Sequence, residues 1–393
     1  MAERNTITSL QRLIRIDQST VRSIRLEDDF RQVEALPNYV LTAQGIATLE
    51  RVFAGLAHQG TKAWTLTGPY GSGKSFFGLF LGRLLNGASS SRRTLATLHP
   101  ALAENIEAWL DSTSGLLTIP ITGSRASLQT CLARGFEKVL QRLEAPFSTL
   151  LLRDLRAVKD GDSRLLLGWL GHFLEEIRAS RAGYIGALVI FDELGKALEY
   201  AGAHPQESDI YLLQELAEFA NRSGETPFAF IGILHQAFEQ YAILLDTATQ
   251  REWAKVQGRF EDIPFQEPPI QQMRLLARAR ESVELPSTIT EQITAACQLA
   301  DATGWRPAML SPDEVANLSQ SVYPLHPTTF VALPYFFRRL GQNERSIFTY
   351  MTSQEPFGFQ EFLAQNELGT FIRLPDLFDY LSANYQGRIY ASG

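Results

Sequence analysis

The sequence has few cysteines and no long apolar run. Its two cysteines, Cys131 and Cys297, lie far apart and fit no disulfide or metal-ligand spacing, so we expect reduced thiols in a cytoplasmic protein. The longest apolar runs, such as ALVIF (187–191) and FAFIGIL (228–234), have the length of buried strands and are far too short to cross a membrane. The N-terminus is charged and lacks the apolar core of a secretion signal. We therefore expect no membrane partner.

The sequence also lacks an excess of positive charge. It has 36 basic and 43 acidic residues, which give a net charge of −7 at pH 7, so no overall field attracts nucleic acid. A local basic groove is still compatible with this balance. Arg274, Arg278 and Arg280 share one helical stretch, and Arg338 and Arg339 follow later. Such arginines are most often a solvated face, so the charge pattern does not show DNA binding.

A glycine-rich loop, GPYGSGKS (68–75), stands between an apolar strand pattern and a helical one. It fits G-x-x-x-x-G-K-[ST], in which glycines let backbone N–H groups surround phosphates at the start of a helix. Lys74 would reach the β- and γ-phosphates, and the Ser75 hydroxyl would bind Mg²⁺. The alternative is a chance glycine turn, which the strand–loop–helix context disfavours. The expected nucleotide-binding residues in this segment are Gly68, Pro69, Tyr70, Gly71, Ser72, Gly73, Lys74, Ser75 and Phe76.

An acidic pair follows a third apolar strand pattern, in ALVIFDELGK (187–196). An aspartate at a strand end holds the Mg²⁺ ligand sphere in phosphate-loop proteins, which assigns Asp192 to the metal. An adjacent glutamate can orient and deprotonate an attacking water, so Glu193 is the expected catalytic base. The alternative is an ordinary acidic helix start. The pair favours hydrolysis over transfer to a small molecule.

Four further residues are weaker candidates. His235 and Gln236 follow a strand that we expect beside the Asp192 strand, where a polar side chain can contact the γ-phosphate or the water; we favour Gln236 as the catalytic residue. Arg259 lies between a helix and a short strand, and as a catalytic residue it would stabilise transition-state charge at its own or a neighbour's nucleotide. Arg345 opens a later helix, where it would bind the nucleotide from a lid domain. The alternatives are packing or helix-capping roles and surface ion pairs.

Strand and helix patterns alternate up to about residue 266 and then give way to helices. This alternation predicts an α/β fold with a parallel sheet flanked by helices, followed by a helical lid. The expected boundaries are an N-terminal helical extension (1–45), a core (46–266) with a helical insertion near 140–182, a lid (267–355) and a further unit (356–393). The last unit starts as if truncated, so we expect the chain to be part of a longer protein.

These motifs together resemble an AAA+ P-loop ATPase of the origin-recognition and STAND-like branch. GPYGSGKS stands for Walker A, LVIFDE for Walker B, His235-Gln236 for sensor 1 and GQNERSIF for the start of a sensor-2 helix. The usual sensor-1 asparagine is missing, and more than a hundred residues separate Lys74 from Asp192, longer than a compact core. TGPYGSGKSFF, VIFDELGKALEY and the 323–353 segment also resemble the N-terminal region of large ATPases of BREX-type phage-defence systems.

The resemblance implies ATP and Mg²⁺ as cofactors and a switch or motor that hydrolyses ATP. It further implies self-association or partner subunits of an antiviral defence complex, or a DNA-linked setting. Two alternatives stay open: a nucleotide-gated scaffold with little turnover, and a small-molecule phosphotransferase, for which the sequence offers no acceptor site. Neither the downstream effector nor the number of subunits follows from the sequence.

Overall fold

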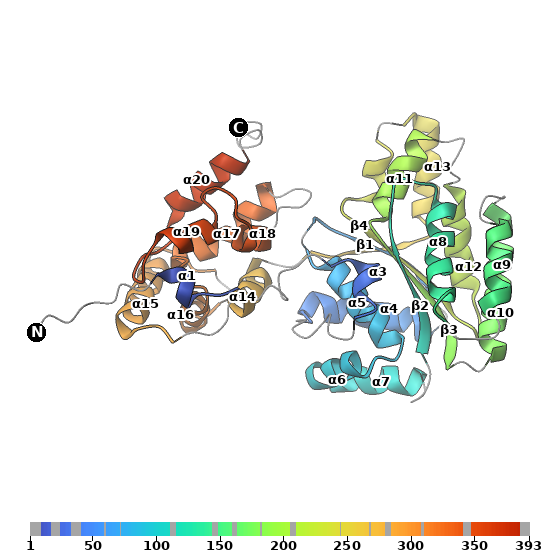
Figure 1. Ribbon diagram of the computed structural model, residues 1–393, viewed down its shortest axis with the longest axis horizontal. Helices are drawn as coiled ribbons and strands as arrows, with labels where there is room; N and C mark the ends of the chain where they lie inside the picture. Colours follow the sequence, from blue (N-terminus) through green and yellow to red (C-terminus); the bar gives the residue numbers. More distant parts are fainter. Residues whose placement is uncertain are drawn as a thin grey trace, which may run out of the picture. The chain divides into compact units, whose positions relative to one another are not determined.

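Figure 1 shows a computed structural model of the protein, which divides into two compact units. The sheet unit comprises residues 24–266, and the helical unit comprises 1–23 together with 267–393. No helix among the residues described is long and apolar enough to span a membrane. The structure describes residues 9–16, 24–32, 41–58, 60–70, 72–110, 115–143, 148–158, 163–180, 183–204, 210–243, 245–266, 269–279, 284–307, 310–340 and 347–385.

A five-stranded sheet forms the centre of the sheet unit, and all of its strand pairs are parallel. Its spatial order is β2-β3-β4-β1-β5, so β4 lies between the other two inner strands. The predicted α/β fold with a parallel sheet is thereby confirmed. Parallel strands all end at one edge, which gathers their following loops there. The strands are β1 (Ala63–Thr67), β2 (Gly115–Thr122), β3 (Tyr184–Asp192), β4 (Phe228–Leu234) and β5 (Glu261–Pro264).

The inner strands are apolar on both faces because both faces are covered. In β3, Leu188 and Ile190 belong to one core, whereas Val189 and Phe191 belong to the core on the opposite face. Successive strand residues point to opposite faces, so double coverage turns the usual apolar–polar alternation into a continuous apolar run. This is the physical origin of the ALVIF pattern.

Two groups of helices cover the sheet (Figure 1). The core that contains Leu188 and Ile190 also contains residues of helices α4 to α7. The core on the opposite face contains residues of helices α8 to α13. The expected insertion near 140–182 is helical and belongs to the second group, as α9 and α10. The first group is α4 (Ala43–Ala57), α5 (Lys74–Leu85), α6 (Ser89–Leu98) and α7 (Pro100–Leu110), with the short α3 (Leu26–Asp29). The second is α8 (Leu128–Leu140), α9 (Ser148–Val158), α10 (Ser163–Ser180), α11 (Leu194–Ala203), α12 (Tyr211–Arg222), the 3₁₀ helix η1 (Phe238–Tyr241) and α13 (Thr247–Gln257).

Polar side chains fix where several of these helices begin. The Ser127 hydroxyl accepts a hydrogen bond from the Thr130 backbone N–H at the start of α8. Asp246 accepts from the N–H groups of Ala248 and Thr249 at the start of α13. Such caps satisfy backbone donors that have no partner inside the helix.

The described part of the helical unit has one apolar core. Tyr350 and Tyr380 lie at its centre, with ring centroids 4.7 Å apart, and both are fully buried. Residues beyond 356 therefore pack in the same core as the expected lid, rather than starting a unit of their own. The helices are α1 (Leu10–Leu13), α14 (Pro269–Ala279), α15 (Ser287–Ala302), α16 (Pro312–Ser321), α17 (Pro327–Leu340), α18 (Ile347–Thr352), α19 (Phe359–Gln365) and α20 (Leu374–Asn384).

The N-terminal segment also belongs to the helical unit, which differs from the expected extension over 1–45. Leu10 and Ile14 are buried in the helical core, and the Leu10 N–H donates to the Asn366 carbonyl oxygen at 3.1 Å. Residues 24–32 instead join the sheet unit, where the Arg83 guanidinium donates to the Asp29 carbonyl oxygen at 2.9 Å. Residues 9–16 and residues 24–32 therefore belong to different units, because each stretch is buried by residues far away in the sequence.

Candidate functional site

The glycine-rich loop lies at the carboxyl edge of the sheet, between β1 and α5. Gly73 has φ +87° and precedes α5 directly, so the chain turns from loop to helix in a left-handed conformation suited to glycine. At Gly68, a Cβ atom would lie 2.2 Å from the Phe265 carbonyl oxygen, so only glycine fits against the residue that follows β5. The helix start supplies the N–H groups and dipole that favour an anion. Gly71 lies outside the described residues.

Lys74 is buried, and its amino group is held by the loop itself. Its Nζ donates to the carbonyl oxygens of Gly68 at 2.6 Å and Pro69 at 2.7 Å, and lies 3.1 Å from Ser72 Oγ. Burial lowers the pKa of Lys74 to about 8, against the opposing effect of the Asp192 carboxylate. A desolvated amine whose acceptors in the described part of the loop are all neutral gains strongly from an incoming phosphate oxygen. The first turn of α5 continues with Ser75 and the half-buried Phe76.

Asp192 ends β3 beside this helix start. Its buried carboxyl group hydrogen-bonds the Ser75 side chain and accepts from the Glu193 N–H at 2.9 Å. Burial raises the pKa of Asp192 to about 6, although the Ser75 hydrogen bond opposes the shift. The two residues expected to hold Mg²⁺ are thus in direct contact, despite their separation in the chain. Oxygen donors of this kind suit Mg²⁺, which keeps several waters and takes its other ligands from substrate phosphates.

No group of three or more His, Cys, Asp and Glu side chains in the described ranges could hold a metal ion. Ser75 and Asp192 are only two protein ligand groups. A divalent ion at this edge would therefore take most of its ligands from phosphate oxygens and water, as is usual for Mg²⁺ at nucleotide sites. The donor set fits a metal that arrives with its nucleotide.

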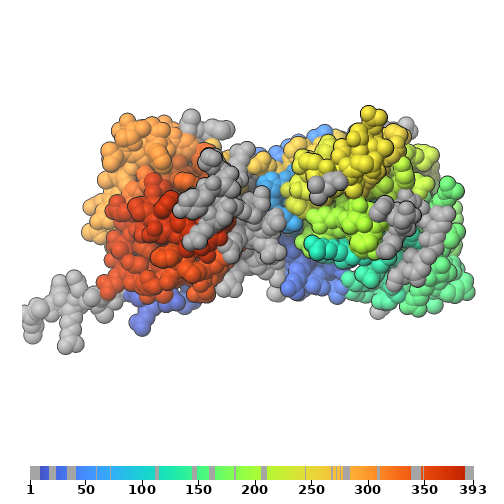
Figure 2. Space-filling model, turned by 90° about the horizontal axis from the view of Figure 1, so that it is seen from above, coloured from blue at the N-terminus to red at the C-terminus, as the bar shows by residue number. Residues whose placement is uncertain are grey.

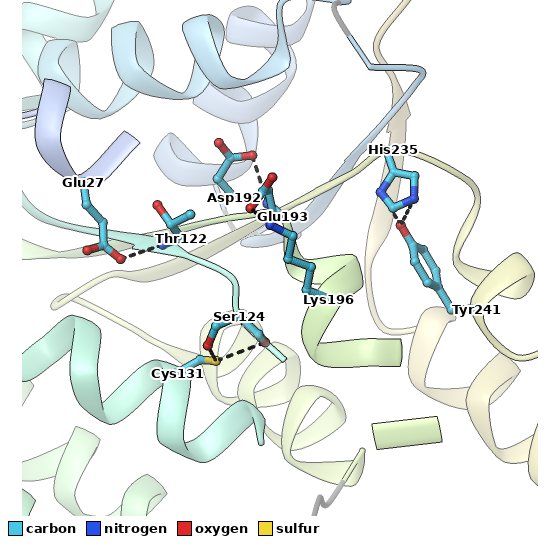
Figure 3. Close-up of polar contacts among 9 residues, drawn as sticks. All are labelled: Glu27, Thr122, Ser124, Cys131, Asp192, Glu193, Lys196, His235 and Tyr241. Carbon is cyan, nitrogen blue, oxygen red and sulfur yellow. Dashed lines mark hydrogen bonds and ion pairs between the residues drawn. The ribbon is translucent and has the colours of Figure 1, made fainter. Parts of the chain in front are cut away.

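Glu193 adopts an unusual backbone conformation. Its φ of 53° and ψ of 35° are left-handed, a region that costs a non-glycine residue on the order of 1–3 kcal/mol. The loop after β2 packs closely against this residue, since a Cβ on Gly123 would lie 2.2 Å from the Glu193 carbonyl oxygen. The Glu193 carboxylate pairs with Lys196 Nζ at 2.5 Å (Figure 3). Strain at this position is typical of functional residues.

His235 and Gln236 follow β4, which pairs with the Asp192 strand as predicted. His235 stacks on Tyr70 of the glycine-rich loop, with ring centroids 4.5 Å apart and planes at 26°. Its Nδ1 lies 3.0 Å from the Tyr241 hydroxyl (Figure 3). The structure thus connects His235 to the loop through Tyr70, whereas the preference for Gln236 stays a prediction.

The two arginine candidates differ in what the structure shows. Arg259 precedes β5, so it lies toward the amino ends of the strands, whereas the loop lies at their carboxyl ends. It is about half exposed, and its Nε lies 3.3 Å from Glu218 Oε1 of α12. The fold does not bring Arg259 to the loop of its own sheet. Arg345 lies outside the described residues.

Lys196 and Tyr241 lie at the site although the sequence did not predict a role for them, whereas Tyr70 was expected there only as a nucleotide-binding residue. Lys196 could have been found, because a cation three residues after an acid on a helix is well placed to pair with it. No sequence pattern indicated Tyr241, since its approach to His235 depends on the 3₁₀ helix η1, of which Tyr241 is the last residue.

The pKa of Asp192 predicts a pH-dependent effect on stability. An aspartate whose folded pKa is raised to about 6 disfavours folding increasingly as the pH rises from about 4 to 6, and constantly above that. We expect Asp192→Asn to raise the melting temperature of the nucleotide-free protein in EDTA by about 2–5 °C at pH 7.5, and by less at pH 5. Asp246→Asn is the control, because the pKa of that exposed helix-capping acid is lowered and no gain is expected. An Asp192 variant no more stable than wild type at pH 7.5 would contradict this account.

Comparisons with known proteins add little. No protein-family model and no curated protein sequence matches the chain significantly. Two similar solved structures are of the ORC2 protein of Aeropyrum pernix, one with ADPNP and ADP and one in the ADP form. The match to the first structure covers 79% of the present chain and 72% of the ORC2 chain, at 12% sequence identity and with a TM-score of 0.39. The match to the second structure covers 87% of the present chain and 72% of the ORC2 chain, at 12% sequence identity and with a TM-score of 0.36. Likeness this low assigns the chain to no family.

Proposed function

We propose that the sheet unit binds and hydrolyses ATP as an AAA+-like module, acting as a nucleotide-driven switch or motor. The observation that carries this proposal is the contact between Ser75 and the buried Asp192, which joins the glycine-rich loop to the acidic strand end. With Lys74 buried beside them, opposite charges lie desolvated around one loop. Such an arrangement is costly in a purely structural role and suits a phosphate with its metal.

Each residue then has a defined task. Lys74 exchanges the carbonyl oxygens of Gly68 and Pro69 for phosphate oxygens, and the loop N–H groups with the α5 dipole hold the remaining charge. Ser75 and Asp192 are the proposed ligands of Mg²⁺, which neutralises phosphate charge when bound. Glu193 orients a water and accepts its proton as the water oxygen bonds the γ-phosphorus and the bond to the β-phosphate oxygen breaks. The products are ADP and inorganic phosphate.

A nucleotide-gated scaffold is the second candidate. The ion pair with Lys196 favours it, because it engages Oε2, one of the two carboxylate oxygens of Glu193 that could accept a proton from water. Hydrolysis then uses the other oxygen or requires this pair to open. Turnover by the wild-type protein distinguishes the two candidates.

The position of Arg259 suggests a role at a neighbouring molecule. Its side chain projects near Glu218, away from the carboxyl edge that holds its own loop. We therefore extend the proposal to self-association, in which Arg259 of one copy stabilises transition-state charge at the nucleotide of the next. The antiviral or DNA-linked setting belongs to the same proposal and rests on motif resemblance. Arg274 lends DNA binding no support, because it donates to Glu314 Oε1 at 2.6 Å within the helical unit.

We expect Arg259→Ala to lower ATP turnover at least about 10-fold while leaving ATP affinity within about 2-fold. We also expect wild-type activity per chain to rise with protein concentration. The control is Arg222→Ala, since Arg222 pairs with the same Glu218 at 3.3 Å and should leave turnover unchanged. Concentration-independent activity, or equal losses in the two variants, would argue against a role in trans.

A further inference from the structure

Tyr241 lies between the candidate catalytic strand end and the helix that begins after Glu193. Its ring is buried, and its hydroxyl is 3.0 Å from His235 Nδ1 and 3.5 Å from Nε2. It belongs to η1, which packs against α11. Figure 2 shows lime-green α11 and the yellow stretch that ends in α13 side by side on one face of the sheet unit. A single hydroxyl thus lies where these elements meet.

Gly195 makes room for this hydroxyl. A Cβ atom built on Gly195 would lie 2.3 Å from the Tyr241 oxygen and 2.6 Å from its ring carbons. Gly195 is in the first turn of α11, two residues after Glu193, where alanine would otherwise favour the helix by about 1 kcal/mol. The close approach of the phenol explains why glycine is suited to this position.

The contact with the Tyr241 hydroxyl favours one tautomer of His235. The Tyr241 oxygen lies within hydrogen-bond distance of both ring nitrogens of His235 and is nearer to Nδ1, so the phenol proton can be donated to that nitrogen. Burial lowers the pKa of His235, which keeps the ring neutral near pH 7. A neutral ring that accepts at Nδ1 carries its proton on Nε2, as a donor. On its flat face the same ring stacks on Tyr70.

We propose that Tyr241 is a positioning residue for nucleotide hydrolysis, which acts by fixing the orientation and proton of His235 beside the glycine-rich loop. The inference rests on the proposed function. His235 lies close enough to Lys74 and Glu193 for both charges to act on its ring. Held between Tyr70 and the Tyr241 hydroxyl, it presents one N–H donor to phosphate oxygen or to the attacking water. Without that hydroxyl the ring can rotate and exchange tautomers, and the donor is lost for part of the time.

The test compares two variants that disturb the contact in different ways. Tyr241→Phe removes only the hydroxyl, and Gly195→Ala displaces the Tyr241 ring without removing any polar group. For both we expect kcat for ATP hydrolysis to fall about 10-fold, with the Kd for a fluorescent ATP analogue within about 2-fold of wild type and a melting temperature within about 3 °C. Tyr184→Phe is the control, because Tyr184 opens β3 about 25 Å from Asp192 and its hydroxyl should not affect kcat.

The outcomes separate this inference from the proposed function. An active wild-type protein whose Tyr241→Phe variant keeps its kcat overturns the positioning role alone. Equal losses of kcat in Tyr241→Phe and Tyr184→Phe also overturn it, since they indicate general destabilisation. A wild-type protein that binds the ATP analogue without turnover overturns the hydrolase proposal, and the positioning role falls with it. A selective loss of kcat in both Tyr241→Phe and Gly195→Ala supports the role.

Discussion

Lys74→Ala is expected to abolish ATP binding, with an increase in Kd of at least about 100-fold and no measurable turnover. The physical reason is that the hydrogen-bond acceptors of the buried amine among the described residues are all neutral, on Gly68, Pro69 and Ser72, until a phosphate is bound. A charge-assisted hydrogen bond in this desolvated loop is stronger than one in water. Titration with a fluorescent ATP analogue, followed by an assay of phosphate release, measures both effects.

Lys62 provides a matched control for this experiment. It is also a buried lysine of the sheet unit, and burial lowers its pKa too, but it lies just before β1 and donates to the Ser223 carbonyl oxygen at 2.7 Å. Lys62→Met should therefore affect stability while leaving the Kd for ATP unchanged. Nucleotide affinity that survives Lys74→Ala, or that falls equally in both variants, would show that the loop is not the phosphate site.

Glu193→Gln is expected to lower ATP turnover by about 100- to 10,000-fold while changing the Kd for ATP less than about 3-fold. Glutamine preserves the shape of the side chain and cannot accept the proton of the attacking water. It also removes the charge that pairs with Lys196. Single-turnover phosphate release and equilibrium binding, both at saturating Mg²⁺, separate chemistry from affinity.

The control for the proposed catalytic base Glu193 is Glu225→Gln. Glu225 is an exposed acid that pairs with Arg178 at the surface of the same unit. It should match wild type in both measurements. If wild-type turnover is no higher than that of Glu193→Gln, the scaffold candidate is correct and Glu193 is not a catalytic base. Appearance of a phosphorylated small molecule in place of free phosphate would instead favour a phosphotransferase.

Local patterns carried most of what the sequence could predict. The glycine-rich loop and the Asp192-Glu193 pair are short contiguous motifs flanked by clear strand and helix patterns, and the structure places both at the carboxyl edge of the sheet. The pairing of β3 with β4 was also predictable, because both runs are continuously apolar. Contacts that depend on three-dimensional packing were beyond reach, as the approach of Tyr241 to Gly195 shows.

The predicted boundaries between structural units differ most from the structure, because they too depend on packing between residues far apart in the chain. Leu10 and Ile14 resemble any short amphipathic segment, and nothing local shows that they are buried against residues more than 250 positions later. Arg259 was correctly placed between a helix and a short strand. Its ion pair with Glu218 requires α12 to lie beside α13, which the sequence did not specify.

The packing of residues 9–16 into the helical unit has a consequence for chain connectivity. The sheet unit is an insertion: the backbone leaves the helical unit after residue 23 and re-enters it at residue 267. Two covalent connections therefore join the units instead of one. A chain cut at one of these connections would therefore leave the two units covalently joined through the other.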